Sequence, residues 1–435
     1  MSFDGGFAAQ AAYGRPDRYR MIEGDCSDMR RIARGGGYSY AAASFGADAM
    51  VLDMTRFDRV LRFDPGARLV EVEAGMQLGD LLDLTAPQGL WLPVQPGYPA
   101  ITVGGCIAAN VHGKNPYREG TFLGSVQELT LFHPRRGTVR VDREREPEVF
   151  ELTCGGYGLT GVILSATLRL EPLAGAGVSV RRIPIGTLAE GLAAVREETQ
   201  DSTFAYTWHD GSPVAGTLGR GFVFRADIPP GPPPARGFVP PYRRIDAARR
   251  ARLAVPLWGR FTTRLLGAGF RALESRRPEQ TRIPLFDAIF PFARRAEYFV
   301  FFGRRGLAEY QALVPDDAVG AFLAELEREI LAHRAPVVMM SMKLFRGTQR
   351  FLRFERDGVC VTLDLVRSAA GLDSLARLDG LVAEVGGLPH IIKDSRLPAA
   401  VVRRCYPEYE LFRERLRAYD PERIFVSELS RMLAL

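Results

Sequence analysis

Cysteine is scarce in this chain of 435 residues, and its positions follow no pattern that binds a metal or builds a disulfide framework. The five cysteines are odd in number, widely scattered and free of any C-x-x-C pair. Small secreted domains use dense, paired cysteines, so this usage favours a reducing compartment. We therefore expect neither a disulfide framework nor a metal site.

Long hydrophobic runs are also missing. No window approaches the ~18 consecutive apolar residues of a membrane span. Residues 1–20, "MSFDGGFAAQAAYGRPDRYR", lack the basic region and apolar core of a secretory signal. We expect a cytoplasmic protein whose membrane contact is at most peripheral, at the inner face of the cell membrane.

Charge of one sign is in small excess. The formal charge of +6 is spread over 57 basic and 51 acidic residues, so anionic partners are favoured only mildly. The densest basic stretch, 240–256, suits anionic lipid or nucleic acid, but a solvated surface is the usual meaning of such a run. We expect no nucleic-acid partner.

The length and the hydrophobic content of 46% predict two or three packed domains. Between 30 and 172, short apolar segments bounded by glycine, proline and aspartate predict strands, and 77–89 predicts a helix that ends at Gly89. A second region begins near 175. Within it, segment 228–241 is half proline and predicts a mobile loop or an insertion.

The last third of the chain is the most regular. After a strand at 297–303, the pattern predicts strands at 309–314, 336–345, 358–366 and 389–393 and helices at 316–334 and 372–387. This β-α-β-β-α-β order is that of a ferredoxin-like unit, whose helices cover one face of the sheet. The fold class is therefore α+β, with a largely antiparallel sheet in the second domain.

Side-chain alternation predicts what lies on the helix-free face. In 358–366 the apolar residues alternate with Cys360, Thr362 and Asp364, which therefore point away from the helices. In 336–345, Ser341 and Lys343 share one face. A wall with a thiol, hydroxyls and an ammonium group indicates a ligand cavity or plain solvent exposure.

Residues 156–161, "GYGLTG", match the letters of the dinucleotide fingerprint G-x-G-x-x-G. That fingerprint needs a following helix, but "VILSATLRLEP" is rich in strand formers and ends at a proline. The sequence therefore excludes a Rossmann site here.

Three glycine-dense stretches remain: 34–40, 96–113 and 154–161. Glycine permits positive φ and close backbone approach, so successive N–H groups can turn toward one anion. The three stretches could wrap a diphosphate together, or each could simply form tight turns.

In this order the three stretches resemble the FAD-binding domain of the vanillyl-alcohol oxidase superfamily. With "GLWLPVQPG", "HGKN", "KLF", "VCVTLDL", "KDSR" and "DPERIFVSELSRML", the chain is similar from about residue 30 onward to the branch that oxidises decaprenylphosphoryl-ribose, least so across 175–295. The resemblance implies an FAD-binding domain at 1–174, a substrate-binding cap at 175–400 and a carboxyl-terminal helical segment, 401–435, that returns to the FAD domain.

The resemblance also implies the site residues. The flavin would be lined by Ala33, Arg34, Gly35, Gly36, Gly37, Tyr38, Ser39, Tyr40, Ala41, Ala42, Ala43, Gly97, Thr102, Val103, Gly104, Gly105, Ala109, Asn110, Val111, His112, Val162 and His390. The substrate would meet Tyr310, Lys343, Cys360 and Lys393. Many relatives bind FAD covalently through the histidine of a G-x-G-H-S loop; here Tyr38 takes that position, which implies non-covalent FAD.

The chemical roles follow from the same resemblance. Burial beside a flavin would let Lys393 accept the proton of the substrate hydroxyl or stabilise the developing alkoxide, with His112 bonded to that hydroxyl or to a phosphate and Tyr40 beside the flavin. Lys393 could also be an ordinary surface lysine, and His112 a satisfied core histidine. Strict alternation separates His390 from Lys393, so Lys393 should lie just past the strand end. Cys360 would be a pocket wall and not a catalyst.

The implied activity is FAD-dependent oxidation of a secondary ring hydroxyl of a polyprenyl-phosphorylated pentose to a ketone, by hydride transfer to the flavin. The keto product would then need a separate reductase. The alternatives are a sugar-lactone or alditol oxidase on the same fold, and a non-catalytic basic module that binds membranes or nucleic acid.

Overall fold

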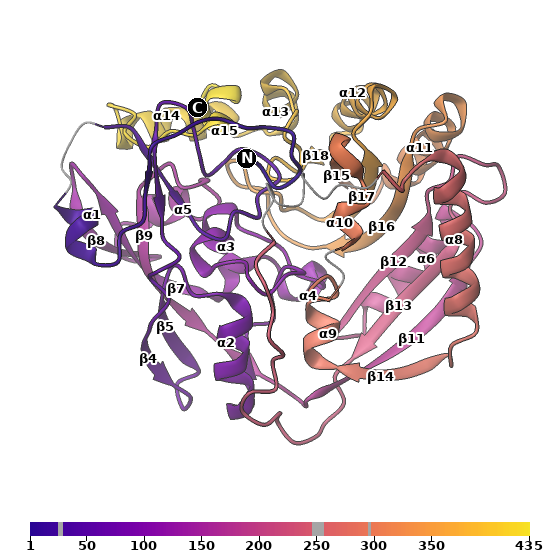
Figure 1. The fold of residues 1–435 in the computed structure, drawn as a ribbon, viewed down its shortest axis with the longest axis horizontal. Helices are drawn as coiled ribbons and strands as arrows, with labels where there is room; N and C mark the ends of the chain where they lie inside the picture. The colour runs from indigo at the N-terminus through magenta and orange to yellow at the C-terminus, as the bar shows by residue number, and fades with distance from the viewer. Residues whose placement is uncertain (25–28, 246–255, 295–296) are drawn as a thin grey trace.

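The structure is a computed structural model that describes residues 1–24, 29–245, 256–294 and 297–435. These residues form two lobes with separate sheets, which lie side by side in Figure 1. The two-domain α+β organisation expected from the sequence is confirmed. Among the described residues no helix is both long and apolar enough to cross a bilayer.

The first lobe carries a five-stranded antiparallel sheet in the order β4-β5-β9-β7-β8 and a small parallel sheet in the order β1-β3-β2. The strands are β1 Tyr13–Gly14, β2 Arg31–Arg34, β3 Met50–Asp53, β4 Val60–Asp64, β5 Leu69–Glu73, β6 Leu90–Trp91, β7 Val126–His133, β8 Gly137–Asp142, β9 Val162–Arg169 and β10 Glu171–Pro172. The helices are α1 Tyr19–Glu23, α2 Leu78–Thr85, α3 Val103–Ala109, α4 Pro116–Glu119 and α5 Pro147–Thr153, with 3-10 turns η1 Ala86–Gln88 and η2 Phe122–Ser125.

The second lobe carries an eight-stranded antiparallel sheet in the order β14-β11-β13-β12-β16-β17-β15-β18. Its strands are β11 Gly177–Ile185, β12 Phe204–Asp210, β13 Gly221–Asp227, β14 Gln280–Pro284, β15 Leu307–Val314, β16 Val337–Phe345, β17 Gly358–Val366 and β18 Leu388–Pro389. Its helices are α6 Leu188–Thr199, α8 Arg260–Ser275, α9 Leu285–Ile289, α10 Glu297–Val300, α11 Val319–His333 and α12 Ala369–Glu384, with the 3-10 turn η3 Gly303–Arg305.

Helices cover one face of this sheet. The alternate residues Val359, Val361, Leu363 and Leu365 of β17 pack in one cluster with Leu326 of α11 and Leu378 of α12. The polar residues between them therefore point to the other face, as the alternation predicts. These elements follow one another in the chain as β15-α11-β16-β17-α12-β18, which is the order that the sequence predicts. The four strands lie in the sheet in the order β18-β15-β17-β16.

The carboxyl-terminal segment forms α13 Ala399–Cys405, α14 Tyr409–Tyr419 and α15 Glu428–Met432. It returns to the first lobe: Arg31 N donates to Ile424 O at 2.8 Å, and Val426 N donates to Arg31 O at 3.1 Å. Figure 1 shows α14 and α15 in yellow above the indigo strands. The end of the chain thus holds the strand that leads into the first glycine stretch.

Three elements differ from the sequence expectations. Segment 297–303 is not a strand but α10 and the start of η3, because an apolar run has no periodicity that separates strand from helix. The last strand stops at Pro389, since proline cannot donate to the ladder, and His390 to Lys393 form a turn. Segment 103–109 is a helix, α3, whose N-cap side chain Thr102 accepts from Gly105 N.

The proline-rich segment 228–241 forms no helix or strand. Its ends are tied to the first lobe, where Gly231 N donates to Ala174 O at 2.9 Å and Val239 N donates to Asp83 Oδ1 at 3.2 Å. The segment therefore crosses from the cap sheet to α2. Helix α8, which follows it, has no counterpart in the elements predicted from the sequence.

Candidate functional site

The first two glycine stretches lie against each other. A Cβ placed on Gly35 would lie 2.1 Å from Thr102 Oγ1, and one on Gly36 would lie 2.6 Å from Ala100 O. The rings of Tyr38 and Tyr98 are 5.1 Å apart. Only glycine permits this approach of the two backbones.

The third stretch closes on α3 from the other side. Tyr157 N donates to Ala108 O at 2.7 Å, and Gly155 N donates to Ile107 O at 3.0 Å. Gly155 and Gly158 have φ of 84° and 79°, the region that glycine favours. Strand β9 follows directly, which agrees with the exclusion of a Rossmann site. The three stretches therefore meet around one short helix and form a single cradle.

The sides of α3 differ. Gly104 is pressed against the first lobe, because a Cβ on it would lie 2.9 Å from Ala74 Cβ and 3.0 Å from Ala74 O. Gly105 is exposed, and its nearest neighbour would be Thr102 Oγ1 at 3.2 Å. A bare backbone surface of this kind fits a diphosphate group.

The remaining cradle residues fall into two groups. Ser39 Oγ donates to Ala41 O at 2.7 Å, and the Tyr38 hydroxyl accepts from Ile245 N at 3.1 Å, so both shape the loop. The second group is buried or partly buried in hydrophobic clusters and consists of Ala33, Ala41, Ala42, Ala43, Val103, Ala109, Val111 and Val162. Val162 packs with Phe132 and Leu164, so only its backbone is available to a ligand. A Cβ placed on Gly97 would lie 3.6 Å from Phe292 Cδ2.

Two polar residues mark the ends of the cradle. At its start Arg34 donates to Ser44 Oγ at 2.9 Å, and burial lowers the pKa of its guanidinium. At its end Asn110 caps α3 with φ of 42° and accepts from Leu123 N at 3.0 Å. Asn110 therefore lies at the end of α3, within the stretch that the sequence assigns to the cradle.

Across from the cradle, the face of the cap sheet opposite α11 and α12 presents polar rows. Strand pairing places Gln311, Thr362 and Ser341 in one row, and Cys360 beside Lys343 in the next. This is the wall that alternation predicts.

His112 joins the cradle to this wall. Its Nε2 lies 3.1 Å from Gln311 Oε1, and its Nδ1 lies 3.1 Å from Gly113 O. Burial, with a smaller contribution from the Lys343 ammonium, lowers the pKa of His112 to about 3. Both neighbours are acceptors, so the neutral ring donates to only one of them.

His390 lies 5.7 Å from His112, ring to ring, and stacks on Phe354 at 4.2 Å with planes 7° apart. Burial lowers the pKa of His390, and the His112 ring adds to this effect. Its Nδ1 is buried with no hydrogen-bond partner in the described part of the chain. An unpartnered buried ring nitrogen at this place fits a missing ligand.

Lys393 lies in the turn after β18, just past the strand end, as expected. Its Nζ is 3.0 Å from Glu309 Oε1 and 4.3 Å from the centre of the Tyr40 ring. Glu309 also accepts from Gln311 Nε2 at 2.6 Å. The ion pair therefore links the cradle residue Tyr40, Lys393 and the sheet wall in one network.

The sequence contains three lysines among its 57 basic residues, and all three lie here. Lys114 stands over the rings of Phe204 and Tyr206 at 5.7 and 5.5 Å. Burial, then the Lys343 ammonium, lowers the pKa of Lys114 to about 7. Burial also lowers the pKa of Lys343, which has no hydrogen-bond or ion-pair partner among the described residues.

Lys114 belongs to the motif "HGKN", which by itself predicts no role for this residue. The scarcity of lysine was the available signal, because every other basic side chain except histidine is an arginine.

Tyr310 is a correction to the predicted substrate residues. Its hydroxyl donates to Asp379 Oδ1 of α12 at 3.1 Å, and its ring packs under the helices. Position 310 alternates with 309 and 311, so Glu309 and Gln311 face the site and Tyr310 faces away. Applied to this strand, alternation would have found both.

Two further groups on the wall have raised pKa values. Burial raises the pKa of the Cys360 thiol to about 11. Burial, followed by the Glu309 carboxylate, raises the pKa of Asp364 to about 7, and Tyr298 donates to Asp364 Oδ2 at 2.5 Å. A neutral thiol is a poor nucleophile, in keeping with Cys360 as a wall residue.

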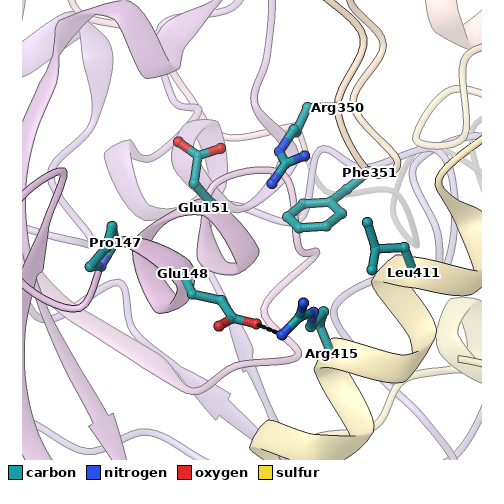
Figure 2. Close-up of a pocket in the computed structure, with 7 residues that line it drawn as sticks. All are labelled: Pro147, Glu148, Glu151, Arg350, Phe351, Leu411 and Arg415. Carbon is teal, nitrogen blue, oxygen red and sulfur yellow. Dashed lines mark ion pairs between the residues drawn. The ribbon is translucent and has the colours of Figure 1, made fainter.

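A cavity of about 300 Å³ lies elsewhere, between α5, the loop at 350–351 and α14 (Figure 2). Glu148 pairs with Arg415 at 3.1 Å, Glu151 with Arg353 at 2.8 Å and Arg350 with Glu408 at 3.1 Å. Its charges are already paired, so we do not assign it a ligand. Among the described residues there is also no group of three or more potential metal ligands.

Known proteins match most of this chain. A family model described as an FAD binding domain matches residues 5–142. Decaprenylphosphoryl-beta-D-ribose oxidase of Mycolicibacterium smegmatis is 30% identical over 418 residues, which cover 93% of this chain and 89% of that protein. An uncharacterised protein of Streptomyces coelicolor is 30% identical over 82% of this chain and 99% of its own length. L-galactono-1,4-lactone dehydrogenase 1 of Oryza sativa is 29% identical over 35% of this chain and 26% of its own.

Proposed function

Because the chain belongs to the decaprenylphosphoryl-β-D-ribose oxidase family of FAD-dependent oxidoreductases acting on CH–OH groups, we propose that it oxidises a secondary ring hydroxyl of a polyprenyl-phosphorylated pentose to a ketone. The observation that carries the proposal is the gathering of all three lysines where the glycine cradle meets the polar wall of the cap sheet. The family assignment sets aside the non-catalytic basic module.

FAD supplies the hydride acceptor. We propose that the backbones of 35–37, 102–105 and 155–161 hold its diphosphate and that Tyr40, His112 and His390 border its ring. Binding is non-covalent in this proposal, because Tyr38 stands where covalent relatives have histidine. Acid precipitation tests this: the yellow colour should stay in the supernatant, and colour that remains on the pelleted chain would contradict it.

The substrate would lie between this cradle and the cap wall. Lys343 has no partner of its own, and with Lys114 it supplies positive charge for the phosphate. The Phe204 and Tyr206 rings under Lys114 offer an apolar surface to the adjoining prenyl chain.

For the hydroxyl, Lys393 is the first candidate. Its pairing with Glu309 supports the role of a fixed cation that stabilises the developing alkoxide, with Tyr40 positioning the ammonium. His112 stays neutral because burial lowers its pKa to about 3, so its unprotonated ring nitrogen can accept a hydrogen bond from the substrate hydroxyl and orient it. The hydroxyl proton would pass to the Lys393–Glu309 pair. Elements β15 to β18 act in this proposal as a ferredoxin-like unit that covers the flavin.

An anaerobic titration followed by visible absorption tests the function. We expect a polyprenyl-phosphoryl pentose to bleach the flavin band of the wild type. The Lys393→Ala variant should keep its colour and lose this reduction by at least about a hundred-fold. The Arg415→Ala variant, altered at the separate cavity, should bleach like the wild type. An active Lys393→Ala enzyme would remove the lysine from the mechanism.

A sugar-lactone or alditol oxidase is the second candidate, favoured by the partial match to the lactone dehydrogenase. Bleaching by a lactone or an alditol, without response to the glycosyl phosphate, would select it. For the first candidate the keto product needs a separate reductase, and a lipid-linked substrate calls for peripheral contact with a membrane.

A further inference from the structure

Helix α8 turns a charged side toward the cap sheet. The side that packs on the cap sheet carries its ion pairs: Arg271 contacts Asp210, and Glu274 accepts from Arg182 Nε at 2.6 Å. Arg182 and Glu274 are both buried, and Gly267 lies against Asp210. Helices on the surface of globular proteins normally turn their apolar stripe toward the core.

Apart from Phe270, the large apolar side chains of α8 point outward instead. Phe261 is 77% exposed, Leu265 61%, Leu273 54% and Leu266 38%. Nine large apolar side chains are exposed in the described ranges of the chain, and these are four of them. The exposed Ala268 and Ala272 lie on the same side of the helix as Phe261 and Leu265. A patch gathered on one helix in this way marks an interaction surface.

Cations border the patch. Arg264 is exposed on the helix, Arg276 is exposed at its carboxyl end, and Arg277 adds a third guanidinium that pairs with Glu274 at 3.3 Å. No acidic side chain lies on the outward side of α8, since Glu274 faces the sheet. Apolar residues bordered by arginines complement an anionic bilayer surface, where the rings and aliphatic chains enter the headgroup region.

The helix also connects to the site. Phe270 of α8 lies 4.4 Å from Trp208, ring to ring. Trp208 shares one face of β12 with Tyr206 and Phe204, the two rings beneath Lys114. Aromatic side chains on one face of β12 therefore lead from α8 toward Lys114.

We propose that α8 docks the protein on an anionic membrane surface, with Phe261, Leu265, Leu266 and Leu273 in the lipid. The choice of a membrane over a second copy of the chain rests in part on the proposed lipid-linked substrate. The docked helix brings the aromatic surface of β12 to the bilayer, so that a prenyl chain can remain near the lipid while its sugar reaches the wall.

Vesicle flotation of the FAD-loaded protein tests this. The wild type should float with vesicles made of equal parts phosphatidylglycerol and phosphatidylcholine, and far less with phosphatidylcholine alone. The Phe261→Gln/Leu265→Gln variant should bind the anionic vesicles at least about ten-fold more weakly than the wild type does. Val60→Gln/Leu61→Gln on β4, which removes two exposed apolar side chains from the other lobe, should float like the wild type.

Three outcomes overturn the proposal: a wild type that stays off anionic vesicles, an α8 variant that floats equally well, or self-association that the α8 variant abolishes without vesicle binding. The last would identify a second copy as the occupant. Flavin bleaching by a short-chain glycosyl phosphate, measured without vesicles, tests the proposed function separately from membrane docking. The α8 variant should bleach normally; flotation without any bleaching would reject the proposed substrate and leave the docking surface intact.

Discussion

At the scale of single residues, the chain uses two cations differently. Arginine stays charged under all ordinary conditions, whereas the lysine amine changes its pKa readily when it is buried. Arginine supplies the surface charges and ion pairs of both lobes, and the three amines are confined to the site. The amine therefore marks positions where a compact or titratable cation is needed.

Lys114 gives a pH prediction at this scale. Its lowered pKa of about 7 means that the amine is charged below that pH and neutral above it. The Kd of a phosphodiester substrate should therefore rise above pH 7, by up to about ten-fold per pH unit. In the Lys114→Arg variant the Kd should be flat over this range, and in Lys114→Met it should be flat and weak. Flavin-monitored substrate titrations at several pH values measure this, and a pH-dependent Lys114→Arg variant would contradict it.

His209 gives a stability prediction. It is fully buried, its Nδ1 lies 2.7 Å from Gly219 O, and burial lowers its pKa to about 4. Between the folded pKa and the unfolded value of 6.5 the unfolded chain binds the extra proton, so stability falls as the pH drops through this window. The slope is about 1.4 kcal/mol per pH unit.

The His209→Gln variant should lack that contribution in denaturant unfolding between about pH 4 and about pH 6.5. His333→Gln, at the exposed end of α11, controls for the loss of a histidine. An unchanged difference between wild type and His209→Gln across this range would rule out a neutral buried ring.

At the scale of elements, α3 separates a packing role from a binding role. Gly104→Ala should destabilise the flavin-free protein by about 1–3 kcal/mol, because its methyl group meets Ala74. In Gly105→Leu the new side chain points away from the lobe, so the flavin-free protein should melt like the wild type. Its Kd for FAD should rise at least about ten-fold, because the side chain prevents close approach of the ligand to the backbone. Thermal melts and FAD titrations measure the two effects. Normal FAD binding by Gly105→Leu would move the diphosphate away from α3.

The elements themselves were largely predictable. Strand 358–366 has the predicted limits, and the helices at 316–334 and 372–387 appear with ends shifted by a few residues. Alternation also oriented β16 and β17 correctly, since a buried face forces a period of two. Periodicity could not decide 297–303, where aromatic residues pack on all sides, nor α8, whose apolar stripe follows no core.

At the scale of the whole molecule, the site depends on contacts that close only when both ends of the chain meet. The resemblance proposed Lys393 and His112 for the site without any knowledge of distance, whereas alternation placed Lys343 and Cys360 on the wall. The Lys393–Glu309 pair and the contact of Gln311 with His112 could not follow from local patterns. They join residues far apart in the sequence, and the second depends on how the two lobes dock. Tyr310 shows the opposite error, a correct segment with the wrong face.

The return of the carboxyl terminus gives the last prediction. Phe425 is fully buried beside β2, and Phe322 is fully buried on the inner side of α11. Replacement of either by alanine should lower the free energy of unfolding by about 3–5 kcal/mol. Only Phe425→Ala should also weaken FAD binding under native conditions, because β2 leads into the cradle. Denaturant melts and FAD titrations of the two variants compare them, and equal FAD affinity would detach the terminus from the cofactor domain.

The restriction of lysine to three positions has a practical consequence. Apart from the α-amino group of Met1, the chain has no other primary amine, and none of the three side chains is fully exposed. Reagents that alkylate amines, and the isotope-labelled methyl groups that reductive methylation adds, would therefore report on the three site lysines and the amino terminus, with almost no other background from the surface.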